Sequence, residues 1–179
     1  MTEPAPTAGS GPQSVAEALS VIAQTPAVLR GFLDGMSEST LSGSAAEEWG
    51  ARQVLEHLID VEGIAFRGRI ARILNEDRPF IRSIDPPARL QEGGYAGRSL
   101  EDLLSELESL RAESTAWLRD IDPADFDREG EHDQAGTIKA GELIHYWAVH
   151  DLVHLRQMLT SLQGRLVPLV GNMHRFLED

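Results

Sequence analysis

The chain has no cysteine among its 179 residues. This absence excludes disulfides, thiolate nucleophiles and cysteine-based zinc or iron–sulfur sites, so any metal ion must be bound by His, Asp or Glu. It also argues against a small secreted domain, because such domains usually depend on disulfides.

Basic residues are scarce: 16 Lys and Arg stand against 29 Asp and Glu, giving a formal net charge of −13. Such a surface repels phosphate backbones, so we expect no nucleic-acid partner. The first residues have no positively charged or apolar signal-peptide region. Charges also interrupt every apolar run before it could span a membrane. The composition therefore predicts a soluble cytoplasmic protein without a membrane partner.

No segment shows the strict apolar–polar alternation of a half-buried strand, whereas four segments show helical periodicity. We predict an all-α antiparallel four-helix bundle with a short extra C-terminal helix. Residues 1–12 are predicted to be a flexible tail and residues 13–179 a single domain. The predicted helices cover about 15–33, 50–75, 99–117, 138–163 (ending before Gly164) and, for the short one, 167–177.

Two connections are too long for a simple bundle: residues 77–98 and residues 120–136. Long loops in small domains are commonly lids or substrate-contacting segments. We therefore expect the 77–98 loop to form a wall of any binding pocket.

Three histidines are predicted to point into the bundle. In the segment HYWAVHDLVHLRQM, His150 and His154 are four residues apart, which places them about 40° apart on one largely apolar helical face. His57 shares the apolar face of the 50–75 helix. An HxxxH pair plus one His from a neighbouring helix provides three nitrogen ligands and leaves metal positions open for water or substrate.

A hydrogen-bonded core histidine is the competing interpretation, because HxxxH alone arises easily by chance. His145 serves as a control: it projects about 140° away from His150, so we expect it at the surface or in an interface. His132, in a loop, and His174, near the C-terminus, are expected to be solvated.

The segments WGARQVLEHLIDVEGIAFRGRI and GTIKAGELIHYWAVHDLVHLRQM resemble the two hallmark regions of the DinB-like family, also called damage-inducible DinB proteins. In that family, one His on the second helix and an HxxxH pair on a later helix bind a divalent metal inside a four-helix bundle. The resemblance implies the ligands His57, His150 and His154, which the analysis of helical faces selects independently.

Two further polar residues are candidates for a role at this site. Asp60 lies one turn after His57 but about 60° off its face, so it could be a fourth ligand, a hydrogen-bond acceptor for a ligand, or a surface residue. Gln157 projects only about 20° from His150 and could reach the site or a bound water. A surface or interface role for either is an equal alternative.

Two classes of function remain open. Families similar to this chain, including mycothiol- and bacillithiol-dependent ones, use the metal to activate a low-molecular-weight thiol, which suggests a metal-dependent thiol S-transferase acting on a small electrophile. The alternative is a non-enzymatic metal- or ligand-binding protein of the stress response. A pocket beside the metal, walled by the 77–98 loop, would favour the enzyme. Nickel, zinc, iron(II) and cobalt all suit three imidazoles.

The 138–163 helix is apolar almost all round, with Val149, Leu152 and Leu159 directed away from the histidine face. A helix of this kind must be buried on nearly every side. We therefore expect a homodimer that includes this helix; the alternative is that the C-terminal segment or the 120–137 loop covers its outer face.

Overall fold

The computed structural model describes residues 12–43 and 49–177, with side chains from residue 15. The predicted flexible tail, residues 1–12, lies outside these residues apart from Pro12, which begins the first helix.

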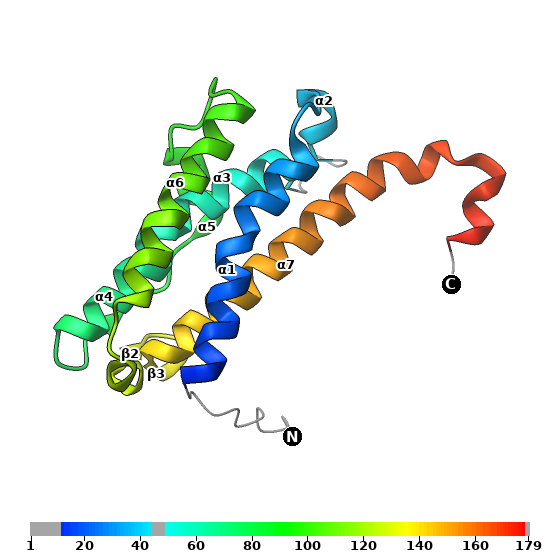
Figure 1. The fold of residues 1–179 in the computed structure, drawn as a ribbon. Coiled ribbons are helices and arrows are strands. Elements are labelled where there is room, and N and C mark those ends of the chain that lie inside the picture. The colour runs from blue at the N-terminus through cyan, green and yellow to red at the C-terminus, as the bar shows by residue number, and fades with distance from the viewer. Residues whose placement is uncertain (1–11, 44–48, 178–179) are drawn as a thin grey trace.

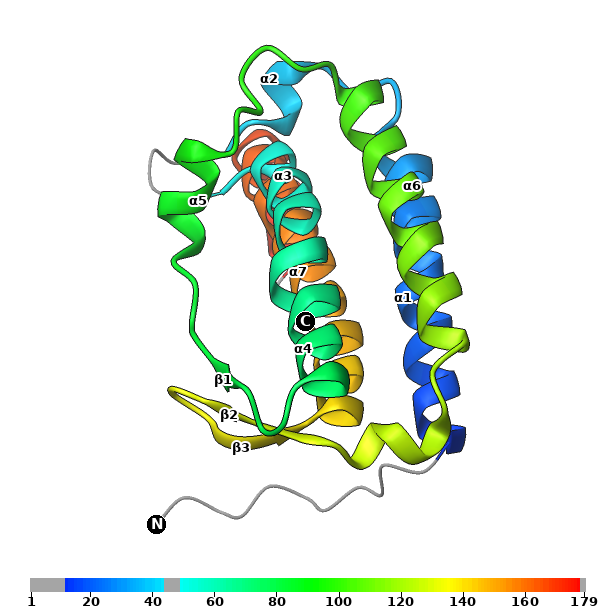
Figure 2. The ribbon, with the colours of Figure 1, turned by 90° about the vertical axis from the view of Figure 1, so that its left-hand side faces the viewer.

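Four long helical segments lie side by side and form the predicted four-helix bundle (Figures 1 and 2). They are α1 (Pro12–Leu33); α3 (Ala51–Val61), continued by the π-helix η1 (Glu62–Arg67) and α4 (Gly68–Asn75); α6 (Leu100–Arg119); and α7 (Ala140–Leu166). Helices α1 and α3 each pack against both α6 and α7. The two segments that carry the three histidines, α3 and α7, are therefore neighbours, as expected.

The predicted helix ends were partly correct: the helix expected from residue 99 begins directly after Ser99. Ser99 and Asp102 cap α6 reciprocally: the Asp102 amide donates to Ser99 Oγ over 3.1 Å, and the Ser99 amide donates to Asp102 Oδ2 over 3.3 Å. The predicted end of α7 before Gly164 was wrong. Gly164 is not among the glycines with positive φ, and the helix continues through it to Leu166.

Short helices occupy the ends and the connections of the bundle. They are the α-helices α2 (Glu38–Leu41) and α5 (Pro86–Glu92) and the 3-10 helices η2 (Pro123–Asp127), η3 (Val167–Leu169) and η4 (Gly171–Phe176). The last two take the place of the predicted C-terminal helix. Among the helices described, none is long and apolar enough to cross a bilayer.

A small sheet, which was not predicted from the sequence, joins the two long connections at one end of the bundle (Figure 2). Strand β1 (Phe80–Ile81) pairs in parallel with β2 (Glu129–His132), which forms an antiparallel hairpin with β3 (Gly136–Lys139). These strands are too short to show an alternating pattern. Ile81 of β1 is buried, and Ile138 of β3 packs against the edge of the core. The sheet ties the 77–98 segment to the β2–β3 hairpin.

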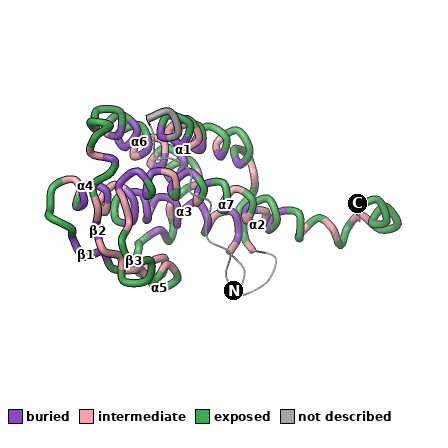
Figure 3. Tube along the Cα trace, turned by 90° about the horizontal axis from the view of Figure 1, so that it is seen from below, coloured by how far each residue is buried: buried purple, intermediate pink, exposed green. Residues whose placement is uncertain are grey.

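The core consists of two apolar clusters. Figure 3 shows the buried residues of the helical segments in purple. One cluster contains Ile22, Phe66 and Trp147; the other contains Leu29 and Met158. Between them, α1, α6 and α7 each contribute a buried polar residue: Thr25, Arg111 and Asp151. A charged side chain buried at this position requires a partner of opposite charge.

Candidate metal centre

The structure brings the three predicted histidines together between α3 and α7. His57 Nε2 lies 3.3 Å from His150 Nε2, and His154 Nε2 lies 3.1 Å from the same atom. Within the described part of the chain, these three residues form a group whose ligand atoms all lie within 4.8 Å of one another. Two nitrogens bound to one ion at about 2.1 Å are about 3.0 Å apart at a right angle and about 3.4 Å apart at a tetrahedral angle. The two measured separations fall in this interval, so the donor set fits a divalent cation.

Aromatic rings surround the cluster. The Trp49 ring lies 5.1 Å from the His57 ring, and Phe66 meets the His150 ring edge-on at 5.0 Å between centroids. The Phe66 ring in turn stacks on Trp147 at 4.8 Å. This packing limits the freedom of the imidazoles, as a preformed ligand set requires.

The surroundings keep the imidazoles neutral. Burial, followed by repulsion from His154, lowers the pKa of His57 to about 4 against the opposing effect of Asp60. Burial and repulsion from His154, His57 and Arg111 lower the pKa of His150 to about 3. Burial also lowers the pKa of His154. A neutral imidazole retains the lone pair that a metal ion needs.

Gln157 fixes the tautomer of His154. Its Oε1 lies 2.8 Å from His154 Nδ1, and an amide oxygen only accepts, so Nδ1 carries the hydrogen and Nε2 presents its lone pair to the cluster. The buried Nδ1 atoms of His57 and His150 meet no acceptor in the described residues. Their tautomers therefore depend on what their Nε2 atoms bind. Gln157 therefore reaches the histidine group, which is one of the roles considered for it.

Asp60 is held away from the cluster. Arg89, from α5, donates to both of its carboxylate oxygens, over 2.7 Å to Oδ2 and 2.8 Å to Oδ1. The structure therefore shows Asp60 as an ion-pair partner that fastens the 77–98 segment to α3, and not as a fourth member of the histidine group. The sequence could not reveal this pairing, because Arg89 belongs to a connection whose path depends on tertiary contacts.

The remaining histidines lie outside the group. His145 Nδ1 contacts the Gly141 carbonyl oxygen at 2.6 Å, one turn away on α7. His174 is exposed in η4. The expectation for His132 was wrong: it lies in β2, its side chain is only 15% exposed, and it lines a pocket beside the cluster.

The histidine cluster opens on a cleft with two lobes. The first lobe, about 420 Å³, is lined by all three histidines and by Phe66 and Tyr146, among others. The second, about 700 Å³, extends over Gln157 and Ser161 towards the later turns of α7. Trp49, Pro86, Val153 and His154 line both lobes. The 77–98 segment contributes Ser83, Ile84, Pro86 and Pro87 to the walls, which is the placement predicted for this loop.

The first lobe also contains hydrogen-bond donors away from the cluster. Arg69 lines it and donates to the Arg82 carbonyl over 2.7 Å. No carboxylate in the described residues forms an ion pair with this guanidinium within 4.0 Å, although Asp133 acts on it from a longer distance. At His132, Nδ1 accepts the amides of Gln134 and Ala135 over 3.2 and 3.3 Å, which leaves the hydrogen of the neutral ring on Nε2.

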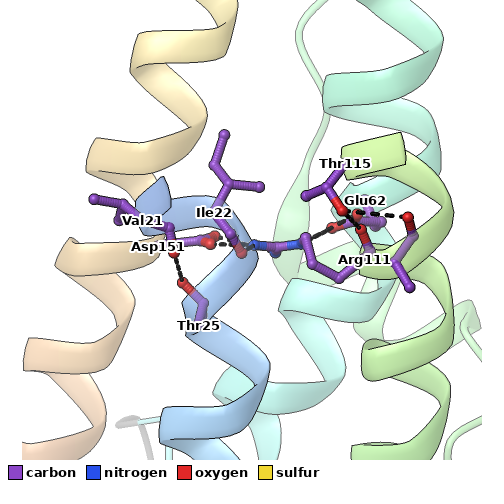
Figure 4. A network of polar contacts seen from close by, with 8 residues as sticks. Val21, Ile22, Thr25, Glu62, Arg111, Thr115 and Asp151 are labelled. Carbon is purple, nitrogen blue, oxygen red and sulfur yellow. Dashed lines mark hydrogen bonds and ion pairs between the residues drawn. The ribbon is translucent and has the colours of Figure 1, made fainter. Parts of the chain in front are cut away.

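A buried ionic network that was not predicted from the sequence includes Asp151, the residue after His150 (Figure 4). Arg111 on α6 donates from Nε to Glu62 Oε2 over 3.0 Å and from Nη1 to Asp151 Oδ2 over 2.5 Å. Its Nη1 also donates to the Ile22 carbonyl of α1 over 2.6 Å. Burial raises the pKa of Glu62, although the nearby Arg111 opposes the shift. The network connects all four long segments next to His150 of the histidine group.

A signal for this network was present in the sequence. Arg111 follows Leu104 by seven residues and Leu107 by four, so it shares their buried helical face. A charge on such a face needs a buried partner. Neither Asp151 nor Glu62 could be chosen as that partner without knowing how the helices are arranged.

The chain is similar to known proteins in sequence and in fold. A family model described as the DinB superfamily matches residues 21–158. A protein of Oceanobacillus iheyensis, named "Putative metal-dependent hydrolase OB0782", is 29% identical over 150 residues, covering 83% of this chain and 86% of that protein. The structure of YfiT from Bacillus subtilis, described as a probable metal-dependent hydrolase with an unusual four-helix bundle topology, matches with a TM-score of 0.79 and 24% identity. That match covers 93% of this chain and 95% of YfiT.

Proposed function

The chain belongs to the DinB superfamily, and on this premise we propose that it is a metal-dependent enzyme that transfers a low-molecular-weight thiol to a small electrophile. The observation that carries the proposal is the meeting of the His57, His150 and His154 Nε2 atoms in one lobe of a cleft whose second lobe also reaches His154. When bound there, a divalent ion would lower the pKa of a coordinated thiol or water, so that either becomes a nucleophile near neutral pH.

His57, His150 and His154 would be the protein ligands of such an ion. All three come from α3 and α7, and the cleft lies beside them, so a small molecule can approach the cluster from the cleft. The group contains no carboxylate, so three neutral imidazoles would leave the positive charge of a bound ion uncompensated. This favours binding of an anionic nucleophile such as a thiolate.

The two lobes support a reaction between two molecules. Each is large enough for a small ligand, and both reach His154, so a thiol in one lobe and an electrophile in the other would meet beside the cluster. In the transfer, the S–C bond forms as the bond from that carbon to its leaving group breaks. The thiol proton leaves to solvent or with the leaving group.

Arg69 and His132 suggest that one of the reactants carries an anionic group. Both line the lobe that contains the three histidines. Burial lowers the pKa of Arg69, but a guanidinium remains charged at neutral pH. A half-buried cation that forms no ion pair within 4.0 Å among the described residues is suited to bind a carboxylate or phosphate of the substrate.

Hydrolysis is a second candidate, with water in place of the thiol. The observation that favours it is that both relatives compared above are named as metal-dependent hydrolases. The two reactions differ in one requirement that can be measured, the need for a thiol.

The test is an assay of the protein loaded in turn with Zn²⁺, Ni²⁺, Co²⁺ and Fe²⁺. Monochlorobimane and 1-chloro-2,4-dinitrobenzene serve as electrophiles, with cysteine, glutathione, mycothiol or bacillithiol as the thiol; p-nitrophenyl acetate without thiol tests hydrolysis.

We expect thiol-dependent turnover that falls at least about 100-fold in His154→Ala and is retained in His145→Ala. Arg69→Ala should raise KM for a carboxylate-bearing thiol more than it lowers kcat.

Turnover of the ester alone would favour the hydrolase over the transferase. Stoichiometric metal binding without turnover of any substrate would contradict both enzymes and favour the non-enzymatic metal-binding protein.

A further inference from the structure

The second lobe of the cleft combines apolar residues with hydrogen-bond donors. Its apolar lining residues come from three parts of the chain and are Trp49, Pro86, Pro87 and Val153. Its donors all belong to α7 and are Arg156, Gln157, Thr160 and Ser161. The volume of about 700 Å³ lies within the range of small-molecule pockets. Such a lining suits a ligand with an apolar body and a polar end.

Gln157 directs its donors away from the histidine cluster. Its Oε1 accepts from His154 Nδ1 over 2.8 Å, so the two N–H groups of the same amide lie on the other side of the carboxamide. They form no hydrogen bond with another residue in the described part of the chain. A ligand in the second lobe, which Gln157 lines, can accept from them.

Ser161 adds a buried hydroxyl without a partner. The residue is only 7% exposed and lines the second lobe, and its Oγ forms no hydrogen bond with any described residue. A buried polar group left unpaired costs about 1–3 kcal/mol. A ligand that accepts a hydrogen bond from Ser161 would remove this cost.

Arg156 brings a positive charge to the same lobe. Its side chain is exposed and forms no ion pair or hydrogen bond within residues 12–43 and 49–177. No described Asp or Glu lines either lobe, although the chain has 29 acidic residues against 16 Lys and Arg. On an acidic protein, a cleft without acids but with an unpaired guanidinium attracts anions. A guanidinium matches the geometry of a carboxylate in particular.

We propose that the second lobe binds the electrophile of the reaction, and that this electrophile is a small carboxylate with an apolar body. The carboxylate would accept hydrogen bonds from Arg156, Gln157 and Ser161. The assignment to the electrophile rests on the proposed transfer function, in which Arg69 binds the thiol in the first lobe.

The apolar residues place the other end of this ligand. Trp49, Pro86 and His154 line both lobes, so they lie where the second lobe leads to the histidine cluster. An apolar body packed against Trp49 and Pro86 would carry its reactive carbon towards His154. The carboxylate would stay at the α7 donors, away from the ligand set.

Calorimetric titration of the Zn²⁺-loaded full chain with 3,5-dinitrobenzoate tests this site without any reaction, because the probe carries no halide to be displaced. 3,5-Dinitrobenzamide has nearly the same shape and no charge. We expect the benzoate to bind at least about 10-fold more tightly than the benzamide, with a preference that decreases as ionic strength rises. Equal affinities of the two probes would overturn the proposal.

Arginine variants locate the bound carboxylate. Arg156→Ala should lower the affinity for 3,5-dinitrobenzoate about 10-fold, and Arg69→Ala should lower it less. Arg119→Ala is the matched control and should bind as the parent chain does: Arg119 is exposed, lines neither lobe and forms no ion pair within the described residues. Insensitivity to Arg156→Ala, or a larger effect of Arg69→Ala, would contradict the site.

Ser161→Ala separates ligand binding from stability. The hydroxyl has no partner among the described residues, so its removal should not lower the free energy of unfolding in urea. It should weaken binding of 3,5-dinitrobenzoate by about 3–10-fold. A loss of stability with unchanged affinity would show that this hydroxyl serves the fold and would contradict its place in the site.

The chlorinated analogue 4-chloro-3,5-dinitrobenzoate extends the test to turnover. The thiol sulfur attacks the ring carbon that carries chlorine: the S–C bond forms, the C–Cl bond breaks, chloride leaves with the bonding electrons, and the thiol proton passes to solvent. Arg156→Ala should raise KM for this substrate more than for 1-chloro-2,4-dinitrobenzene. Binding of 3,5-dinitrobenzoate that depends on Arg156, without turnover of either chloride, would support the carboxylate site and contradict the transferase.

Discussion

At the scale of single residues, the site depends on which ring nitrogen of each imidazole carries no hydrogen and can therefore bind a metal ion. His154 is the clearest case, because Gln157 occupies its Nδ1 and leaves its Nε2 towards the other two histidines. Hydrogen bonds of this kind orient metal-binding histidines and increase their basicity. Gln157 is therefore a positioning residue that acts through His154.

We predict that Gln157→Ala lowers metal affinity by about 10–100-fold without removing the binding stoichiometry at saturating metal. Competition with a chromophoric chelator measures this affinity. Gln157→Glu keeps an acceptor at the same place and should restore most of the affinity. Equal affinities of Gln157→Ala and the parent chain would show that the contact does not orient His154.

Much of the residue-scale picture was predictable from helical periodicity. His57, His150 and His154 were selected because each lies on an apolar face, and the structure places them together. Periodicity could not predict that Arg89 binds Asp60, because the two residues are brought together by α5, whose position depends on packing. Local patterns identify the face of a helix, and only tertiary structure identifies its partners.

At the scale of elements, the second helical segment contains a feature that its periodicity did not show. It is interrupted by the π-helix Glu62–Arg67, in which the Gly68 amide donates to the Gly63 carbonyl five residues earlier. Turns of this kind are often associated with functional sites. Here the turn begins with Glu62, one of the two acids that bind Arg111.

Alanine substitutions at the two glycines joined by this hydrogen bond, Gly63 and Gly68, should have opposite effects on stability. A Cβ on Gly68 would lie 2.6 Å from the Gly63 carbonyl oxygen, so Gly68→Ala should destabilise the fold by about 1–3 kcal/mol. A Cβ on Gly63 would meet nothing within 4 Å, and Gly63→Ala should stabilise the helix by about 0.5–1 kcal/mol. Urea unfolding of both variants measures these changes; equal signs would show that the π-turn does not exist in solution.

The strands show why some elements were not predicted. Strand β1 has two residues, and β2 and β3 have four each. Segments of this length contain too few side chains to show a period. They exist because the two long connections meet at one end of the bundle, which is a tertiary event. His132 was consequently expected to be solvated although it lines the cleft.

At the scale of the whole molecule, Arg111 connects the four long segments through one guanidinium. It binds Glu62, Asp151 and the Ile22 carbonyl, and its side chain is only 2% exposed. Asp151 adjoins His150, so the network also fixes the part of α7 that carries the histidines. The sequence predicted the bundle and the proximity of α3 and α7, but not this connection across it.

We predict that Arg111→Met destabilises the protein by about 3–5 kcal/mol, because Glu62 and Asp151 would remain buried without a cation. Arg67→Met is the matched control: its ion pair with Glu113 is 3.3 Å long and exposed, so the change should be within about 1 kcal/mol. Chemical unfolding of chelator-treated protein separates this effect from metal binding. Similar losses in the two variants would mean that the network contributes no special stability.

The central claim is that His57, His150 and His154 bind one divalent ion, and elemental analysis of protein purified without an affinity tag tests it most directly. The account predicts one equivalent of divalent metal per chain in the parent protein. The metal should be lost in His154→Ala and retained in His145→Ala, whose ring contacts Gly141 instead of the cluster. Absence of stoichiometric metal from the parent chain after incubation with each candidate ion, or equal loss from both variants, would contradict the account.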